Sequence, residues 1–218
     1  MPTITAQSII SKAQILAQDT TGVRWPASEW LGWLNDAQRE IAIARPNSFT
    51  KIASVPLVAG TKQSIPSDGI MFIEYYRAMG AAGTTPGSSA RKVDRRLLDS
   101  QIPSWHTATA TAAPQHYIFD PLAPKTFYVY PPSTGGVQAE ILYSASPTDV
   151  AAAANTISLD DIYATVILDY LLYRAYSKDS EFVGNAERAL VYRKAFEGAI
   201  GLKTTADNTA VAKENIKG

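Results

Sequence analysis

The sequence contains no cysteine and only two histidines, and its 20 lysines and arginines balance its 20 aspartates and glutamates. Without cysteine there can be no disulfide, thiolate nucleophile or cysteine-based zinc site, which fits assembly in a reducing cytosol. Zero net charge excludes a global basic field for wrapping nucleic acid, although a local basic patch is allowed. No apolar run is long enough to span a membrane. Residues 1–19 lack the basic region and apolar block of a signal peptide.

What remains is a globular composition, with 46% hydrophobic and 18% charged residues in a chain of 218. Two helices are predicted near the N-terminus, over residues 5–19 and 26–45, and Pro46 ends the second. Apolar residues of the second helix recur at helical spacing and form one stripe, which predicts packing against other helices. The stripe consists of Trp30, Leu34, Ala37, Ile41 and Ala44, while Asn35, Asp36, Gln38, Arg39 and Glu40 fall mostly off it.

The middle of the chain is rich in β-branched and aromatic residues, punctuated by glycine, proline and aspartate, which predicts strands of a small antiparallel sheet. The strand-like segments are "FTKIASVPLVAG", "IMFIEYYRAMG", "HYIFD", "KTFYVYPP" and "VQAEILYSA". Between them, residues 80–89 read as a flexible loop, and "RRLLDSQIPSW" favours a helical turn.

Helical patterning returns near the C-terminus. Ser158 and Asp161 have capping-box spacing, so a helix is predicted from Ser158 to about Ser177. A last helix begins at Asp179 or Ser180 and ends at Gly201, and the polar remainder reads as a tail.

These predictions define an α+β protein in which N- and C-terminal helix pairs form an antiparallel α-helical bundle. The bundle is assigned to residues 1–46 and 158–202, the β-rich insertion to residues 47–157, and the extended C-terminal tail to residues 203–218.

Candidate catalytic groups are few. His106, His116 and Asp120 could hold a metal or supply a base with its orienting acid, but they lie in irregular, proline-flanked sequence without a nucleophile motif. Surface histidines are the simpler interpretation. Asp160 and Asp161 are explained by a helix start, and neither Asp169 nor the pair Asp179 and Glu181 completes a catalytic pattern. "GAAGTTPG" lacks the Gly-Lys-Ser/Thr ending of a phosphate loop. No catalytic, metal or cofactor site is therefore predicted.

Two features suggest contacts with other macromolecules. The basic cluster Arg91, Lys92, Arg95 and Arg96 could be a solvated face, meet an acidic patch on a partner, or touch nucleic acid phosphates. Trp33 lies at the edge of the helical stripe, and it and Trp105 are candidates for a subunit interface, although the protein's own core is the simpler place for most aromatic residues.

Three stretches resemble the head-to-tail adaptor (connector) proteins of short-tailed, podovirus-like bacteriophages. They are "RWPASEWLGWLNDAQREIAIARPN" (24–47), "RKVDRRLLDSQIPSWH" (91–106) and "LDDIYATVILDYLLYRAYSKDSEFVGNAERALVYRKAFEGAIG" (159–201). The order of helical pair, strand-rich middle, helical pair and polar tail is similar over nearly the whole chain.

The resemblance implies a structural virion protein without cofactors, assembled in the host bacterial cytoplasm. Such adaptors form a ring, generally dodecameric, between the portal and the tail nozzle, fibres or spikes, and leave a channel for genome passage. The C-terminal segment commonly grips the portal; here it contains Lys203, Val211, Lys213, Ile216 and Lys217. The alternatives are another neck or tail-tube component, a DNA-binding module using Arg91–Arg96, and an enzyme using the histidines.

Overall fold

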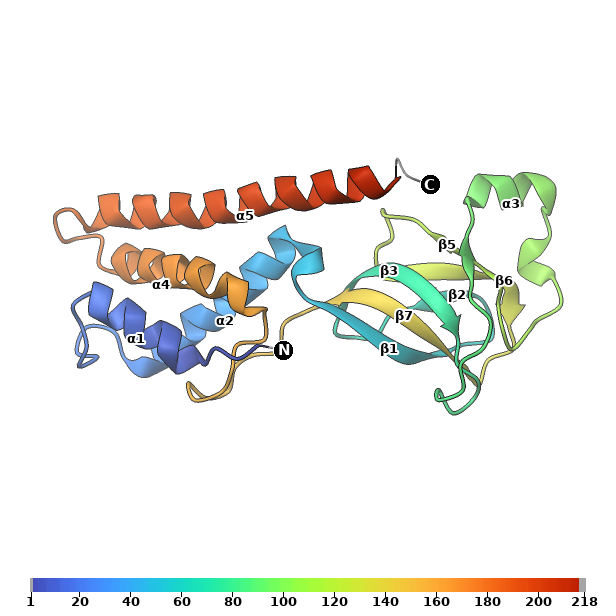
Figure 1. Ribbon diagram of the computed structural model, residues 1–218, viewed down its shortest axis with the longest axis horizontal. Coiled ribbons are helices and arrows are strands. Elements are labelled where there is room, and N and C mark those ends of the chain that lie inside the picture. The colour runs from blue at the N-terminus through green and yellow to red at the C-terminus, as the bar shows by residue number, and fades with distance from the viewer. Residues whose placement is uncertain (1, 216–218) are drawn as a thin grey trace. The chain divides into compact units, whose positions relative to one another are not determined.

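The chain folds into two compact units. The computed structural model describes residues 2–215, and it describes their side chains as far as residue 201. The helical unit comprises residues 1–49 and 147–218, and the β unit comprises residues 50–146 (Figure 1). Five α-helices and two sheets among the described residues confirm the mixed α+β class. No helix of the described part is long and apolar enough to cross a membrane.

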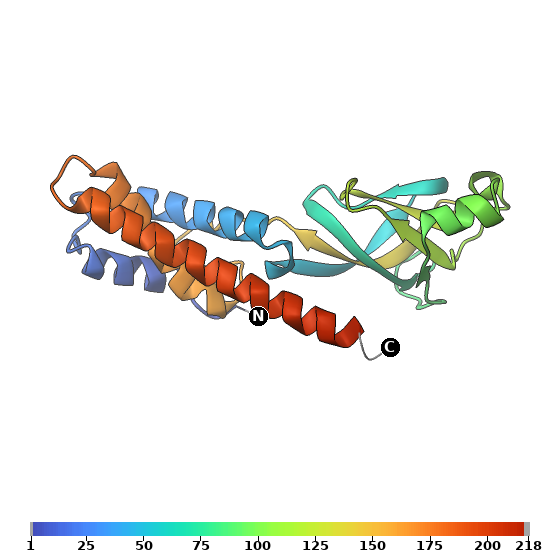
Figure 2. The ribbon, with the colours of Figure 1, turned by 90° about the horizontal axis from the view of Figure 1, so that it is seen from above.

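Four of the helices belong to the helical unit, and α4 is the element that contacts the other three. In two views of this unit, α5 runs along α4 (Figures 1 and 2). Short 3-10 turns precede β1 and α4. The helices are α1 (Ala6–Leu16), α2 (Ala27–Ala44), α4 (Ala164–Lys178) and α5 (Asn185–Asn215), and the turns are Pro46–Ser48 and Asp161–Tyr163.

The core of the helical unit begins with a chain of indole rings. The ring of Trp30 meets Trp25 at a centroid distance of 5.6 Å and Trp33 at 5.3 Å, both edge to face. This geometry is favoured by the quadrupoles of aromatic rings. The predicted stripe is buried at Trp30, Leu34, Ala37 and Ile41, whereas Ala44 is exposed.

One arginine fastens α5 to two other helices. Arg193 lies 2.6 Å from the carboxylate of Glu40 on α2 and 2.7 Å from that of Glu197 on α5. Its guanidinium also lies over the rings of Tyr173 and Phe196. Because its charge is paired and its plane is stacked, Arg193 joins α2, α4 and α5 at one point.

The β unit contains two sheets. Their strand orders are β1-β7-β3 and β2-β6-β5-β4, and all pairs are antiparallel except β4 with β5. Helix α3 (Arg95–Gln101) and a 3-10 turn at Trp105–Thr107 lie between β4 and β5 in the chain. The strands are β1 (Thr50–Leu57), β2 (Gly60–Ser64), β3 (Gly69–Ala78), β4 (Arg91–Lys92), β5 (His116–Phe119), β6 (Thr126–Ser133) and β7 (Val137–Ala145).

Aromatic side chains from both sheets fill the β unit. Phe72 on β3 stacks on Phe127 of β6 with ring centroids 4.3 Å apart, and it also meets Tyr117 of β5. Phe72 and Phe127 are fully buried. Burial of Tyr75 raises the pKa of its hydroxyl to about 12, because the ionised form would lose its hydration.

Two predictions about the C-terminal helices differ from the structure. The capping box is wrong: the carboxylate of Asp160 receives the N–H of Ile162, while the Ser158 hydroxyl donates to the carbonyl of Thr148. The last helix begins at Asn185 rather than at Asp179 and does not end at Gly201, because its backbone stays helical to Asn215. The predicted extended tail is therefore not confirmed.

Candidate interaction surfaces

The structure places the two histidines in separate aromatic settings. The Nδ1 atom of His106 lies 2.8 Å from the Thr61 hydroxyl, and its ring stacks on Trp105. His116 stacks on Tyr130, and its Nδ1 atom is buried without a hydrogen-bond partner among the described residues. The carboxylate of Asp120 accepts the N–H of Leu122. No cluster of three or more potential metal-ligating side chains occurs in the described part of the chain.

The carboxylates singled out in the sequence have structural tasks. Asp161 accepts the hydroxyl of Thr3 at 2.5 Å and the N–H groups of Thr3 and Ile4 at 2.9 and 3.1 Å. These bonds, from the hydroxyl first, hold the pKa of Asp161 below its ordinary value. Asp161 thus ties the N-terminal segment to the start of α4.

The other carboxylates do not form a catalytic pair. Asp179 pairs with Arg24 at 2.7 Å, and burial against its neighbours raises the pKa of Asp169. Glu181 is exposed. Each therefore has a setting of its own, and none shares a proton site with another.

The glycine-rich loop folds back on β3 rather than forming a phosphate cradle. Ala78 donates its N–H to the carbonyl of Ser88 and receives the N–H of Gly87 on its own carbonyl. Gly83 has a φ of +71°, and a Cβ atom there would lie 2.3 Å from the side-chain oxygen of Gln138. Glycine at position 83 therefore serves close packing against β7.

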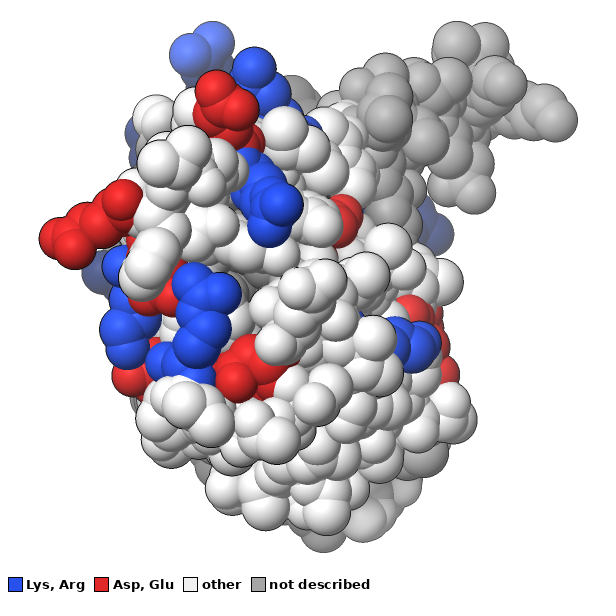
Figure 3. Space-filling view, turned by 90° about the vertical axis from the view of Figure 1, so that its left-hand side faces the viewer, with Lys and Arg blue, Asp and Glu red and all other residues white. Residues whose placement is uncertain are grey.

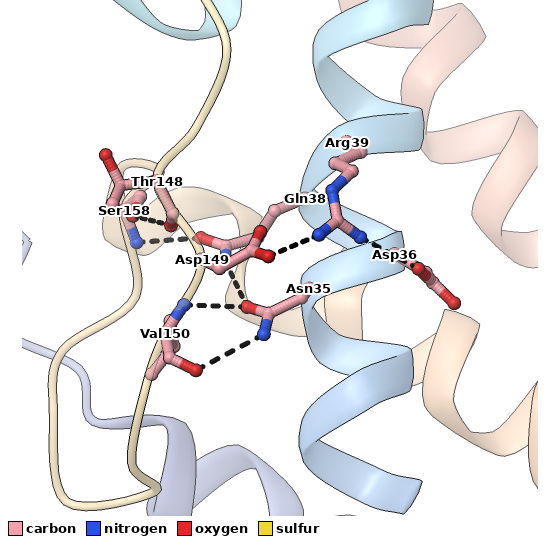
Figure 4. Close-up of polar contacts among 8 residues, drawn as sticks. All are labelled: Asn35, Asp36, Gln38, Arg39, Thr148, Asp149, Val150 and Ser158. Atoms are coloured by element: carbon pink, nitrogen blue, oxygen red, sulfur yellow. Dashed lines mark hydrogen bonds and ion pairs between the residues drawn. The ribbon is translucent and has the colours of Figure 1, made fainter.

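Two amide side chains of α2 hold the segment that returns from the β unit. The side-chain oxygen of Asn35 accepts the N–H of Val150 at 2.8 Å, and its nitrogen donates to the carbonyl of Val150 at 3.2 Å (Figure 4). The side-chain oxygen of Gln38 accepts the N–H groups of Ser158 and Leu159 at 2.7 and 3.3 Å. Since Gln38 is only 1% exposed and Leu159 is buried, these bonds satisfy polar groups in a setting with little access to water.

Arg39 adds a charged contact to the same segment. Its guanidinium pairs with Asp149 and, at 3.0 Å, with Asp36 on its own helix (Figure 4). The polar side chains of "LNDAQRE" therefore hold residues 148–159 in place. This part of the sequence is a structural motif of the helical unit.

Three of the four residues of the basic cluster line a groove of the β unit with a volume of about 900 Å³. Lys92 comes from β4, whereas Arg95 and Arg96 come from the first turn of α3. Arg91 is exposed on β4 but does not line the groove. We call this feature the basic groove; it is lined by Lys92, Val93, Asp94, Arg95, Arg96, Ile118, Phe119, Asp120, Pro121, Ala123, Thr126 and Tyr128.

A second groove, of about 840 Å³, lies at the end of the helical unit where α1 leads to α2 and α4 leads to α5. Leu16 and Val191 line it together with Arg24 and Arg188. In Figure 3, which shows this end, charged side chains gather on the left while uncharged residues fill most of the lower part. Contiguous exposed apolar surface is typical of contact sites. Exposed apolar residues near these loops are Ile15, Leu16, Val23, Phe182, Val183, Leu190 and Val191.

The two tryptophans considered for a subunit interface lie in the protein's own cores. Trp33 is 8% exposed and packs on Trp30, and Trp105 is 1% exposed with its indole N–H donated to Asp99 at 2.9 Å. Both rings therefore offer little surface to a neighbouring subunit.

The residues considered for portal docking fall outside what the structure describes in atomic detail. Ile216 and Lys217 lie beyond the described residues, and the side chains of Lys203, Val211 and Lys213 are not described.

Sequence reasoning missed the structural importance of Asn35 and Gln38, because both stand beside the apolar stripe. Their spacing of three residues places them on one face of α2, and this spacing could have indicated a shared contact. It also missed the apolar loop that carries Phe182 and Val183, which are 64% and 105% exposed. Apolar residues in a turn can be buried or exposed, and the sequence does not distinguish these cases.

The described residues thus define a protein with two cores, polar groups committed to holding its own chain, and open grooves on each unit. Open grooves and exposed apolar loops of this kind are typical of surfaces that contact other macromolecules.

The family model described as SU10 adaptor protein matches residues 4–214, so the chain belongs to the SU10 adaptor protein family. The matched residues include both units, and the resemblance to phage adaptors is confirmed. The chain is accordingly a phage adaptor, a structural component of the virion that interacts with other virion proteins. Among curated proteins there is no match.

Proposed function

We propose that the protein is the head-to-tail adaptor of a short-tailed phage. It would form a ring, dodecameric as is general for such adaptors, between the portal and the tail, and leave a channel through which the genome passes. The observation that carries this proposal is the family match over residues 4–214, which includes both units rather than one of them.

Residues 203–218 are the proposed portal-docking segment, with Lys203, Val211 and Lys213 in the C-terminal part of α5, and Ile216 and Lys217 beyond the described residues, as its contact residues. Its backbone is helical as far as Asn215, so we propose docking by a helix rather than by an extended arm. Trp33 and Trp105 act in this proposal by supporting the two cores, and the subunit contacts fall on exposed surface instead.

Removal of residues 203–218 tests the docking role. We expect the truncated protein to keep its circular dichroism and tryptophan fluorescence, because the described packing of α5 uses Ala189, Phe196 and Ile200, all before the cut. We expect it to lose co-sedimentation with portal rings. Undiminished co-sedimentation would refute portal docking by this segment.

A pair of double variants separates specific docking from charge. V211D with I216D places two carboxylates at the apolar positions of the segment, and T205D with N208D places two at polar positions. Docking through Val211 and Ile216 predicts loss of portal binding only in the first variant. Equal loss in both would mean that net charge, rather than the apolar contact, controls binding.

Ring formation and position are tested by imaging. The purified protein mixed with portal rings should appear in negative stain as a ring on the tail-facing end of the portal with an open centre. Density on the portal wall, or a closed plug, would favour the alternative of a different neck or tail-tube component.

A further inference from the structure

The basic groove carries positive charge that the protein itself does not neutralise. Lys92 and Arg96 make no ion pair with any described residue, although two carboxylates line the same groove. Asp94 accepts the N–H of Arg96 and Asp120 accepts the N–H of Leu122. Neither carboxylate forms an ion pair with Lys92 or Arg96, so both cations are available to an outside anion.

Arg95 adds to this charge, because its one ion pair is weak. It lies 3.4 Å from Asp99, and the two side chains are 63% and 47% exposed. Exposed pairs of this kind contribute little and are screened by salt. An incoming carboxylate could therefore compete with Asp99 for Arg95 at low cost.

The position of two of these arginines disfavours folding. Arg95 and Arg96 lie in the first turn of α3, where the helix dipole places partial positive charge. A cation there costs about 0.3–1 kcal/mol when exposed, and Arg91 and Lys92 stand only a few residues away. The helix dipole therefore gives no stability reason for Arg95 and Arg96 at this position, which supports a binding role for them.

The floor of the groove is apolar. Ile118 is 4% exposed and packs with Leu98 and Trp105, and its cross-strand partner Tyr128 is half-buried on the same face of the sheet. A hollow with an apolar floor and a rim of cations matches a peptide that carries carboxylates and one large apolar side chain. It suits duplex DNA poorly, because phosphates gain nothing from an apolar surface.

We propose that the basic groove docks an acidic segment of another virion protein. Carboxylates of that segment pair with Lys92 and Arg96, and an apolar side chain packs on Ile118 and Tyr128. The inference rests on the proposed function only for the source of the segment, since the chemistry of the groove belongs to this chain.

The test uses the full-length protein and short overlapping synthetic peptides that cover the portal and tail proteins encoded with it. Binding is measured by fluorescence anisotropy for the wild type and for K92E with R96E. This variant should fold, because R96E replaces an unfavourable charge in the first turn of α3 with a favourable one. Its circular dichroism checks this.

The matched control is K12E with K194E, which makes the same change in net charge at exposed lysines on α1 and α5 of the helical unit, neither of which lines the groove. We expect the bound peptides to contain several acidic residues and a large apolar one. Their affinity should fall at least about tenfold in K92E with R96E and much less in the control.

Three results would overturn the inference. They are the absence of any bound peptide, equal weakening in both variants, and competition of duplex DNA or inorganic phosphate for the groove at concentrations where the peptides bind. Portal co-sedimentation is measured in parallel on the same variants. A variant that loses peptide binding but still co-sediments with portal rings shows that the groove and portal docking are separate. Failure of the groove inference can therefore be distinguished from failure of the proposed function.

Discussion

The polar side chains that hold the helical unit together and those that line the basic groove of the β unit are used in opposite ways. In the helical unit, Gln38 and Asn35 are committed to the backbone of the returning segment, and Asp161 to the N-terminal segment. In the β unit, Lys92 and Arg96 face a groove without an ion-pair partner among the described residues. A committed polar group stabilises one conformation, whereas an uncommitted one remains available for a contact made during assembly.

The comparison also extends to the cores. Three of the four tryptophans, at positions 25, 30 and 33, lie in the helical unit, and Trp105 lies in the β unit. Each unit therefore has its own fluorescent reporter. Replacement of Trp105 by phenylalanine leaves a protein whose indole emission follows the helical unit alone.

The largest expected effect comes from the aromatic core of the β unit. F127A removes the ring that stacks on Phe72, and we expect a loss of about 3–5 kcal/mol. If the units unfold separately, urea titration should show Trp105 emission changing early while the helical signal keeps its midpoint. The control is L122A, because Leu122 is 93% exposed in the same unit and should change little. A common shift of both signals would show that the two cores unfold together.

A smaller effect is expected from the amide of α2. Q38A leaves the N–H groups of Ser158 and Leu159 without their acceptor, and we expect a loss of about 2–4 kcal/mol from the helical unit. Urea unfolding followed by fluorescence of the W105F protein measures it. Q7A, at an exposed glutamine of the same unit, is the control. Equal losses in the two variants would contradict a special role for Gln38.

The smallest expected effect concerns acid stability. The pKa of Asp161 is lower in the folded protein than its ordinary value of 3.8, so its bonds stabilise the fold above that value. This contribution is lost as the pH falls through the lower, folded pKa. In D161N the urea midpoint should be lower at neutral pH and should change less between neutral pH and about pH 3. E181Q removes an exposed carboxylate and should keep the pH dependence of the wild type; an unchanged dependence in D161N would argue against the clamp.

Much of the element order was readable from local patterns. The helix predicted over residues 26–45 is α2 at Ala27–Ala44, and five strand-like segments correspond to β1, β3, β5, β6 and β7. Strand β2 was missed because "GTKQS" is polar and is held by pairing with β6 rather than by propensity. The end of the last helix was misplaced because a lack of aromatic residues was taken as a lack of structure, although alanine, lysine and glutamate there favour helix.

The candidate surfaces were only partly predictable. The basic cluster could be recognised in the sequence. Its groove could not, because it depends on β5 and the turn after it, which are separated from Arg95 in the sequence. The burial of Trp33 was not predictable either, because it depends on how residues of distant helices pack around the edge of the α2 stripe.

The sequence by itself determined the α+β class, the apolar stripe of α2, the absence of cysteine chemistry and membership of the adaptor family, because local periodicity, composition and motif order are properties of the linear chain. The tertiary structure decided that Gln38 and Asp161 hold the chain together while Lys92 and Arg96 stay open. Whether a polar group is committed depends on which distant backbone or side chain folds against it, and no local pattern encodes that.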